Sequence, residues 1–230
     1  MANQFIIGRG TEVTIALLQP GIREEVVPQT ITVGATEAAA LATTITVAPL
    51  TEPLFASETS PVFLAFEDAV TGGERFVKVT APAADGATSL TVAPLKRAIS
   101  PASTGQYPVK LQARTSADLS TTANNVTSTT FDESGYVDGI VASIGYGISC
   151  PGNFIQLDAG FRTAFFAFNE FREVWITLKM PNPGAGYSSG YIFKGAASVT
   201  DCPIATPADG IITANLTLEM RGKLEILEPQ

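Results

Sequence analysis

The chain has 230 residues, of which 45% are hydrophobic, and its 14 basic and 22 acidic residues give a formal net charge of −8. That length can bury a sizeable core, while the acidic balance argues against a protein that grips a phosphate backbone, which needs clustered Lys and Arg. The sequence contains no histidine, the commonest general base and usual zinc ligand, so we expect no enzyme, no cofactor and no metal site.

The first expected strand lies within residues 5–18, where apolar residues alternate with small or polar ones before a Pro-Gly pair. Residues 22–29 carry two adjacent acidic residues, Glu24 and Glu25, and a proline, so we expect an exposed connection or arm. The start of the chain lacks the basic and apolar regions of a secretory signal, and no run of eighteen apolar residues follows. We therefore expect a protein made in, or assembled from, a cytoplasm, with no membrane partner.

An internal repeat comes next. Residues 38–50 (AAALATTITVAPL) match residues 83–95 (AADGATSLTVAPL) at a fixed offset of 45, with nine identities in thirteen positions. Each copy follows a strand-like run, at residues 30–33 or 75–80, and closes with a proline, which cannot donate to a sheet. Stacking two such units would let each cover the other's apolar face, so we expect residues 30–101 to form a small inserted β subdomain.

Beyond the repeat, a short strand is expected at 107–114, followed by the polar stretch 115–130. This stretch cannot build a core, so it is expected to be a long ordered loop or an edge strand. From Tyr136 to Ser149, bulky residues fill most even positions and glycines several odd ones. The pattern predicts a strand with one bulky face and one bare face that another backbone could approach closely.

The segment from Asp158 to Met180 predicts the one convincing helix of the chain and the strand that follows it. Asp158 suits the N-cap, and Asn169 suits the turn that ends the helix. Aromatic residues recur at intervals of three and four, which places them along one side of the helix. This side, expected to be buried as the plug of a β core, consists of Phe161, Ala164, Phe165, Phe168 and Phe171. From Glu173 the period changes to two, which predicts a strand over 173–180.

The last part of the chain predicts further strands. One is expected at 191–199, after a glycine-rich tip. A cleaner alternating strand follows Asp209-Gly210, with Ile212 and the later even-numbered apolar residues pointing inward, and a short final strand comes after Gly222. The two cysteines, Cys150 and Cys202, each precede a proline without metal-ligand spacing. We interpret them as free thiols, with a disulfide between two loops as the alternative.

Two patterns that could carry chemistry are better explained structurally. Residues 186–190 (GYSSG) fit the G-x-S-x-G nucleophile motif, but they lie between two expected strands in a chain without histidine, whereas the mechanism needs a strand, a sharp turn, a helix and a histidine. Three adjacent acidic pairs, which could each be half of a glycosidase site, are interpreted as solvated turn residues. They are Glu24-Glu25, Glu67-Asp68 and Asp132-Glu133.

Several stretches, in order, resemble the tail tube (major tail) proteins of long-tailed bacteriophages. The resemblance begins with GRGTEVTIA (8–16) and continues with the polar loop NNVTSTTFDESG (124–135). It is then carried by the helix after Asp158 with its following strand VWITL, and by residues 191–226. It covers about residues 1–29 and 102–230. The repeat region, 30–101, departs from the family pattern, as either an inserted surface subdomain or a rearranged part of the tube wall.

The resemblance implies a mainly β protein, a β-sandwich tail-tube domain (1–29 and 102–230) with one flanking α-helix, plus the inserted repeat subdomain. It implies a structural virion protein that forms hexameric rings, stacked into the tube through which the genome is ejected. The implied partners are other copies of the chain and other tail proteins such as a sheath, terminator, baseplate or tip, with DNA passing through the lumen without specific binding. The implied location is the virion tail, assembled in the host cytoplasm.

Polar segments without a core of their own are what strand pairing between subunits would order. We therefore expect residues 118–135 and the arm 20–29 to lie at contacts within or between rings. Deleting residues 120–130 should leave a folded monomer that no longer forms tubes. The candidate interface residues are Asn124, Asn125, Thr129, Thr130, Phe131, Asp132, Glu24 and Glu25.

Two alternatives stay open. The chain could be another virion component, such as a tail terminator or a capsid decoration protein, in which the repeat subdomain carries the attachment. It could also be a carbohydrate-binding β-sandwich, although its tyrosines and Trp175 form no obvious aromatic platform in the sequence.

Overall fold

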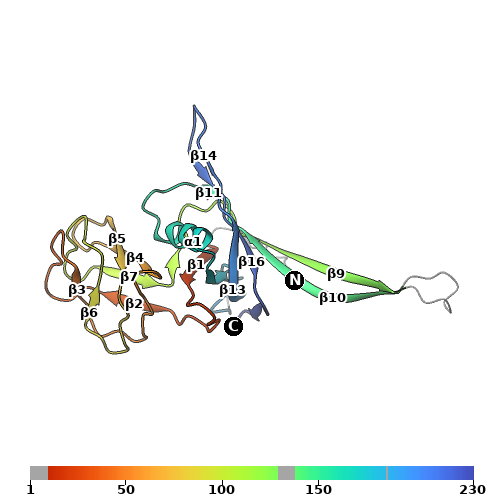
Figure 1. Ribbon diagram of the computed structural model, residues 1–230, viewed down its shortest axis with the longest axis horizontal. Coiled ribbons are helices and arrows are strands. Elements are labelled where there is room, and N and C mark those ends of the chain that lie inside the picture. The colour runs from red at the N-terminus through yellow and green to blue at the C-terminus, as the bar shows by residue number, and fades with distance from the viewer. Residues whose placement is uncertain (1–9, 129–137, 185) are drawn as a thin grey trace.

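The computed structural model describes residues 10–128, 138–184 and 186–230, and it shows a mainly β protein with one helix (Figure 1). The predicted fold class is confirmed. The repeat-containing strands gather at one end of the molecule, the helix and main sheet form the middle, and a long hairpin, β9–β10, projects from the other end. In chain order the first eight strands are β1 (Glu12–Leu17), β2 (Gln29–Thr32), β3 (Thr44–Thr46), β4 (Val62–Glu67), β5 (Glu74–Val79), β6 (Ser89–Thr91), β7 (Thr104–Tyr107) and β8 (Val109–Lys110). The later elements are β9 (Asp118–Ser128), β10 (Asp138–Ser149), β11 (Gly152–Asn153), α1 (Ala159–Asn169), β12 (Glu173–Lys179), β13 (Ile192–Asp201), β14 (Ile204–Ala205), β15 (Thr213–Ala214), β16 (Thr217–Met220) and β17 (Glu225–Leu227).

The main sheet has eight strands in the order β8-β1-β12-β13-β16-β10-β9, with β17 also paired to β13. Next to the β8 edge, β1 and β12 form an antiparallel pair in which Ile15 stands opposite Ile176, and both side chains are fully buried. The alternation predicted for 173–180 is confirmed, since Val174, Ile176 and Leu178 are all buried. The sheet has two edges: the two-residue β8 and the eleven-residue β9.

Helix α1 begins as predicted, because the Asp158 side chain accepts a hydrogen bond of 2.9 Å from the Gly160 backbone N–H. The helix contacts β1 and β13 of the main sheet and also β4 of the repeat-containing end. Gly160 permits this close packing: a Cβ at that position would lie 2.6 Å from the backbone oxygen of Lys110. The helix therefore packs against both the main sheet and the repeat-containing end.

The buried side of α1 differs from the predicted one. Only Phe161 and Ala164 of the predicted set are buried, whereas Phe165, Phe168 and Phe171 are 43%, 38% and 96% exposed. The helix instead buries mainly small residues: Ala159, Gly160, Thr163, Ala164 and Ala167. Small side chains let the helix axis approach the sheet closely, and the larger aromatic residues are left on the outer side.

The two copies of the repeat pair directly with each other. β3 and β6 are antiparallel neighbours, with Ile45 opposite Leu90, its own equivalent 45 residues later. The flanking bridges obey the same rule, because Ala38 pairs with Ile99 while Leu54 pairs with Ala83. At the offset of 45, Ala83 is the equivalent of Ala38 and Ile99 is the equivalent of Leu54, so the second bridge joins the equivalents of the residues in the first. The two copies are therefore related by a local pseudo-twofold axis through β3 and β6. Beside them, β2, β7, β4 and β5 form a four-stranded sheet in that order.

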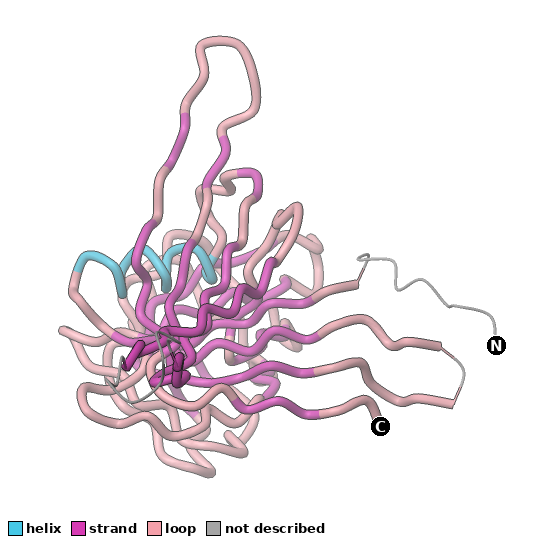
Figure 2. The backbone as a smooth tube through the Cα atoms, turned by 90° about the vertical axis from the view of Figure 1, so that its right-hand side faces the viewer, coloured by secondary structure: helices cyan, strands magenta, loops and turns pink. Residues whose placement is uncertain are grey.

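The strand predicted after Asp209-Gly210 is divided between two sheets. β16 belongs to the main sheet, whereas β15 pairs with β11 and β14 in a separate three-stranded sheet. Ala214, Leu216 and Leu218 are buried as predicted, but Ile212 is 38% exposed because it precedes the strand at the root of a second arm. This second arm, residues 204–214, rises from the body in both ribbon views (Figures 1 and 2).

Both cysteines are free thiols, as predicted, and both are buried. Burial raises the pKa of the Cys150 thiol to about 12 and that of Cys202 to about 11, which leaves them protonated and unreactive near neutral pH. Within the described ranges, no helix is long and apolar enough to cross a membrane.

Candidate assembly surfaces

The β9–β10 hairpin is the most extended feature of the chain. Its two strands pair from Asp118 opposite Ser149 to Ser128 opposite Asp138, with a bulge between Val141 and Ser143. The polar stretch predicted as a loop or an edge strand is thus an edge strand. Strand β9 is bonded to β10 along one side and ends the order of the main sheet, so its other side offers backbone groups to a further strand.

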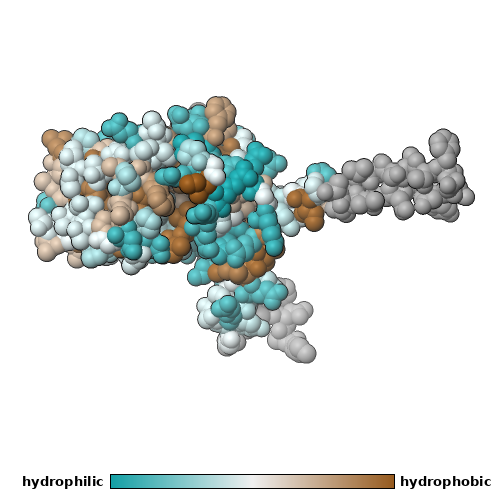
Figure 3. All heavy atoms as spheres, turned by 60° about the horizontal axis from the view of Figure 1, so that its bottom comes forward, coloured by the Kyte–Doolittle hydropathy of each residue, from teal (hydrophilic) through white to brown (hydrophobic). Residues whose placement is uncertain are grey.

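The side chains at the root of this hairpin pack on the body, but those farther out do not. Ile148 is 1% exposed, whereas Ile144, four residues closer to the tip on the same face, is 55% exposed. On the bare face, a Cβ at Gly145 would come within 4 Å only of the backbone oxygen of Thr122, on the neighbouring strand. Among the described residues, only strands paired with β10 come within 4 Å of the Cβ positions of Gly145 and Gly147, so the close approach predicted for this face is not seen at these two glycines. Figure 3 shows hydrophobic surface where the arm leaves the body.

Two of the candidate residues in the hairpin region, Asn124 and Asn125, lie within the described part of the chain. The Asn124 side chain donates a hydrogen bond of 3.2 Å to the Ser143 hydroxyl across the hairpin. Asn125 stands opposite Val141 in the ladder. The four remaining candidates of this region lie outside the described residues; they are Thr129, Thr130, Phe131 and Asp132.

The arm predicted at residues 20–29 is exposed over most of 20–28, whereas Gln29 is buried as the first residue of β2. Salt bridges hold the arm to the body. Arg23 makes a two-pronged contact with the Glu173 carboxylate, at 2.6 and 2.7 Å. Lys194 on β13 donates to Glu25 at 2.8 Å and lies 3.4 Å from Glu225. The hydrogen bond to Glu25 raises the pKa of Lys194, which keeps it charged. Glu24, also a candidate, is exposed beside these contacts.

The structure does not bring the two candidate groups together into one site. Glu25 is held at β13, whereas Asn124 is held at β10, and β16 lies between these strands in the sheet. They therefore belong to two separate surfaces.

A buried arginine that the sequence did not single out lies between the root of the β9–β10 hairpin and the root of the second arm, residues 204–214. Arg114, with a side chain only 6% exposed, donates to the backbone oxygens of Gln112 (2.8 Å), Ala214 (3.1 Å), Asn153 (3.2 Å) and Cys150 (3.3 Å). Its guanidinium also lies 3.9 Å from the fully buried Asp158 carboxylate at the start of α1. Burial raises the pKa of that carboxyl, and the backbone N–H of Gln112 opposes the shift. Arg114 thus fixes the ends of β10, β11 and β15 against the helix.

Sequence reasoning also missed two exposed apolar groups. One is the outer side of α1, with Phe165, Phe168 and Phe171. Phe171 has a positive φ of 53°, a left-handed conformation that is costly for a bulky residue. The other lies on the second arm, where Ile204, Ile211 and Ile212 are 41%, 68% and 38% exposed. In the helix, the row of small residues on the side opposite the phenylalanines could have indicated which side is buried. In the second arm, no sequence pattern distinguishes the exposed isoleucines from core residues.

Comparisons with known proteins give the following result. No protein-family model matches the chain, and no curated protein matches it. Three solved structures are similar to about half of it. A subunit in the tail of an empty gene transfer agent particle, solved with C6 symmetry, aligns over 50% of this chain and 82% of its own, with 19% identity and a TM-score of 0.42. A chain of the native gene transfer agent virion aligns over 50% and 85%, with 19% identity and a TM-score of 0.41. A chain of the six-fold anti-feeding prophage baseplate aligns over 53% and 84%, with 8% identity and a TM-score of 0.43.

Proposed function

We propose that this protein is a structural subunit of a phage-type tail, and that it forms hexameric rings that stack into the tail tube through which the genome leaves. The observation that carries the proposal is the β9–β10 hairpin. A two-stranded hairpin is marginally stable in water on its own, and this one extends beyond the body with exposed side chains. Its outer edge can accept a strand from a neighbouring copy, which would order the arm on assembly.

The outer side of α1 supports a second contact between subunits. Exposed aromatic residues that gather on one helix side are typical of interfaces, where large rigid side chains contribute most of the binding energy. Phe165 stacks on the buried Phe161 at a centroid distance of 6.3 Å, so its ring is held in place before any partner binds. Phe171 keeps a strained backbone while its side chain is 96% exposed, and a contact with another copy would explain why glycine is not used there.

The negative net charge of the chain is compatible with the wall of a tube through which DNA passes. A net charge of −8 per subunit, multiplied around a ring, would give an acidic wall that repels phosphates and lets DNA slide without adhering. The hexamer itself comes from the tail-tube resemblance of the sequence.

Electron microscopy of the purified protein, together with its mass in solution, tests the proposal. We expect hollow tubes or stacked six-fold rings; single rings that never stack would instead favour a terminator. A hairpin-shortened variant, in which an Asn-Gly turn replaces residues 122–145, keeps the pair Thr121–Tyr146 and closes the strands with a favoured two-residue turn. This variant should stay a folded monomer and form no tubes. Normal tubes from it would contradict the proposal.

A matched pair of point variants separates assembly from folding. Ile144→Ser removes an exposed apolar side chain from the hairpin, and Val70→Ser removes one, 78% exposed, from the turn between β4 and β5. Each should change the free energy of unfolding by at most about 0.5 kcal/mol. Only Ile144→Ser should raise the protein concentration needed for assembly, measured by light scattering. Equal effects from the two variants would argue against a role for the hairpin.

A further inference from the structure

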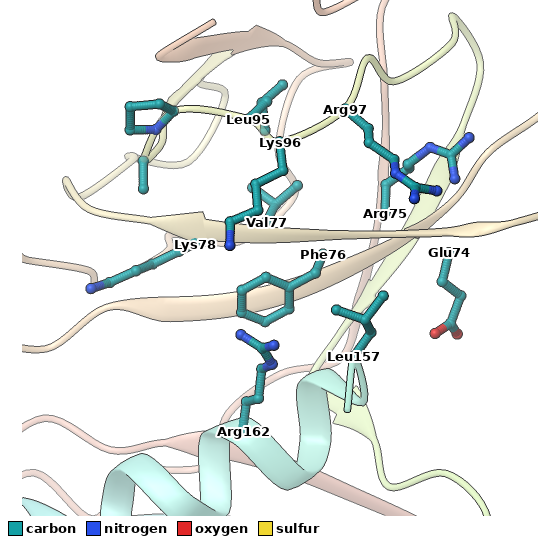
Figure 4. A pocket seen from close by; sticks show the side chains of 12 residues that line it. Glu74, Arg75, Phe76, Val77, Lys78, Leu95, Lys96, Arg97, Leu157 and Arg162 are labelled. Atoms are coloured by element: carbon teal, nitrogen blue, oxygen red, sulfur yellow. The ribbon is translucent and has the colours of Figure 1, made fainter. Parts of the chain in front are cut away.

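Five of the fourteen basic residues of this acidic chain line one cleft. The cleft has a volume of about 370 Å³ and lies between β5, the end of the second repeat copy and the start of α1 (Figure 4). Its floor is apolar, formed by Phe76, Val77, Pro94, Leu95 and Leu157. We call this pocket the cationic cleft. Glu74 is the one carboxylate among its lining residues, and its basic residues are Arg75, Lys78, Lys96, Arg97 and Arg162.

Two of these cations are already engaged within the chain. Arg75 lies 3.8 Å from Asp68 and donates to Thr71 and to the backbone of Ala98. Arg162 covers the Phe76 ring at 4.4 Å from its centroid. In contrast, Lys78, Lys96 and Arg97 have no carboxylate within ion-pair distance among the described residues. Three positive charges are therefore left beside an apolar floor.

An apolar floor with unpaired cations fits an acidic peptide that also carries a large apolar side chain. A nucleic acid would need an extended basic track rather than one compact cleft. The sequence offers one such peptide. Of its three adjacent acidic pairs, Glu24-Glu25 is tied to Lys194 through Glu25, and Glu67-Asp68 is tied through Asp68 to the backbone of Ser100 and Thr71.

The remaining pair, Asp132-Glu133, directly follows Phe131 in the segment that connects β9 to β10. It thus combines one aromatic side chain with two carboxylates. The hairpin extends away from β5 and α1, which border the cationic cleft (Figure 1), so a chain cannot fill its own cleft with this segment. A second copy can, and such a head-to-tail contact can be repeated along a ring or a stack.

We propose that the cationic cleft binds residues 131–133 of a neighbouring copy, with Phe131 on the apolar floor and the two carboxylates on Lys78, Lys96 and Arg97. The inference rests on the proposed function, because it names the contact through which the subunits assemble. It also gives the repeat-containing end a role in assembly.

Charge reversal in the full chain tests the contact. The cleft variant Lys96→Glu/Arg97→Glu changes two exposed side chains, and the tip variant Asp132→Lys/Glu133→Lys changes the proposed partner. Each variant alone should form no tubes. A chain that carries all four changes restores opposite charges at the contact and should assemble again. Mixing the cleft variant with the tip variant should also restore tubes, since the native tip of one fits the native cleft of the other and the reversed tip fits the reversed cleft.

Controls distinguish the possible failures. Lys179→Glu/Lys223→Glu makes the same change in net charge at exposed positions outside the cleft and should assemble normally. A synthetic peptide of residues 129–137 should inhibit tube formation by the wild-type chain, and the same peptide with Asn and Gln at 132 and 133 should not. If the wild-type chain forms tubes and the cleft variant forms them equally well, the proposed contact between cleft and tip is rejected, while the proposed tube function is kept. If the cleft variant fails but the tip variant assembles, the cleft binds another partner and the proposed occupant is wrong. If the wild-type chain forms neither rings nor tubes, the proposed function fails, and absence of peptide binding by that chain would then also overturn the contact.

Discussion

The strands at the two ends of the molecule differ in where they find pairing and packing partners. At the repeat-containing end, each copy of a duplicated segment supplies the strand and the bridges that the other copy lacks, so Ile45 and Leu90 are completely buried without help from another chain. At the hairpin end, β10 pairs with β16 only over Gly147–Ser149; farther out, β9 and β10 pair only with each other among the described residues, and Ile144 stays exposed. The difference indicates that the repeat end is completed within the monomer, while in the proposed function the hairpin end is completed by a neighbouring copy.

The largest expected effect is at the root of the hairpin. Arg114→Ala removes four hydrogen bonds to backbone oxygens and leaves the buried Asp158 carboxylate without its cation. Breaking a buried pair in this way typically costs about 3 to 5 kcal/mol of unfolding free energy. Urea unfolding would measure it, and Arg114→Lys should recover only part of the loss because lysine lacks the planar fork. A loss below about 1 kcal/mol would mean that the arms do not depend on this junction.

The pseudo-twofold axis predicts a symmetric loss at the other end. Ile45→Ala and Leu90→Ala each empty a fully buried site in β3 or β6 and should each cost about 2 to 5 kcal/mol. Because the two side chains face each other, the double variant should cost less than the sum of the two single variants. Strictly additive losses would show that the copies do not support each other. Ile144→Ala, in the hairpin, should cost almost nothing in the same measurement.

Acid should weaken the repeat end in particular. The Asp68 carboxylate accepts backbone hydrogen bonds from Ser100 at 3.0 Å and Thr71 at 2.8 Å, and these bonds hold its pKa well below the usual range. A lowered folded-state pKa contributes stability that is present above the unfolded pKa of about 4 and is lost as the pH falls further. Thermal unfolding between pH 7 and pH 3 should therefore show a steeper loss for the wild type than for Asp68→Asn. Asp85→Asn, in an exposed turn of the second copy, should keep the wild-type slope.

The smallest effect should be a gain. Leu41 has a left-handed φ of 66°, and its equivalent 45 residues later is Gly86, with a φ of 74°. Leu41 is 76% exposed, so Leu41→Gly loses little contact and relieves a backbone strain of about 1 kcal/mol. Calorimetry should show a slightly higher melting temperature for Leu41→Gly and a lower one for Gly86→Leu. Destabilisation by both changes would mean that the Leu41 side chain has a packing role that its exposure hides.

Local patterns in the sequence predicted much of this fold. The Asp158 cap, the period-two pattern of β12, the edge strand at 118–128 and the two free cysteines all follow from nearby residues. The pairing of β1 with β12 does not, because it joins segments about 160 residues apart and any apolar strand would satisfy the pattern.

The helix shows why the exposed apolar surface was harder to predict than the fold. Both sides of α1 have spacings of three and four residues, one with small residues and one with phenylalanines. Buried area alone favours the aromatic side, but Gly160 needs the close approach to Lys110, and that contact selects the small side. A sequence does not reveal which apolar residues are reserved for a second chain. The cationic cleft was missed for a related reason, since its cations come from β5, the second repeat copy and α1.

The duplicated segment has a consequence for how separate molecules of this protein can pair. A strand completed by its own duplicate has the arrangement of a homodimer whose two chains have been fused, which is what gene duplication would leave behind. The same arrangement allows the first copy in one molecule to exchange with the second copy in another. The β4–β5 hairpin opposes this exchange, because it folds the segment between the two copies, residues 51–82, back on itself and gives the copies a high effective concentration for each other. Shortening the turn between β4 and β5 until the hairpin cannot close would therefore favour molecules that exchange copies.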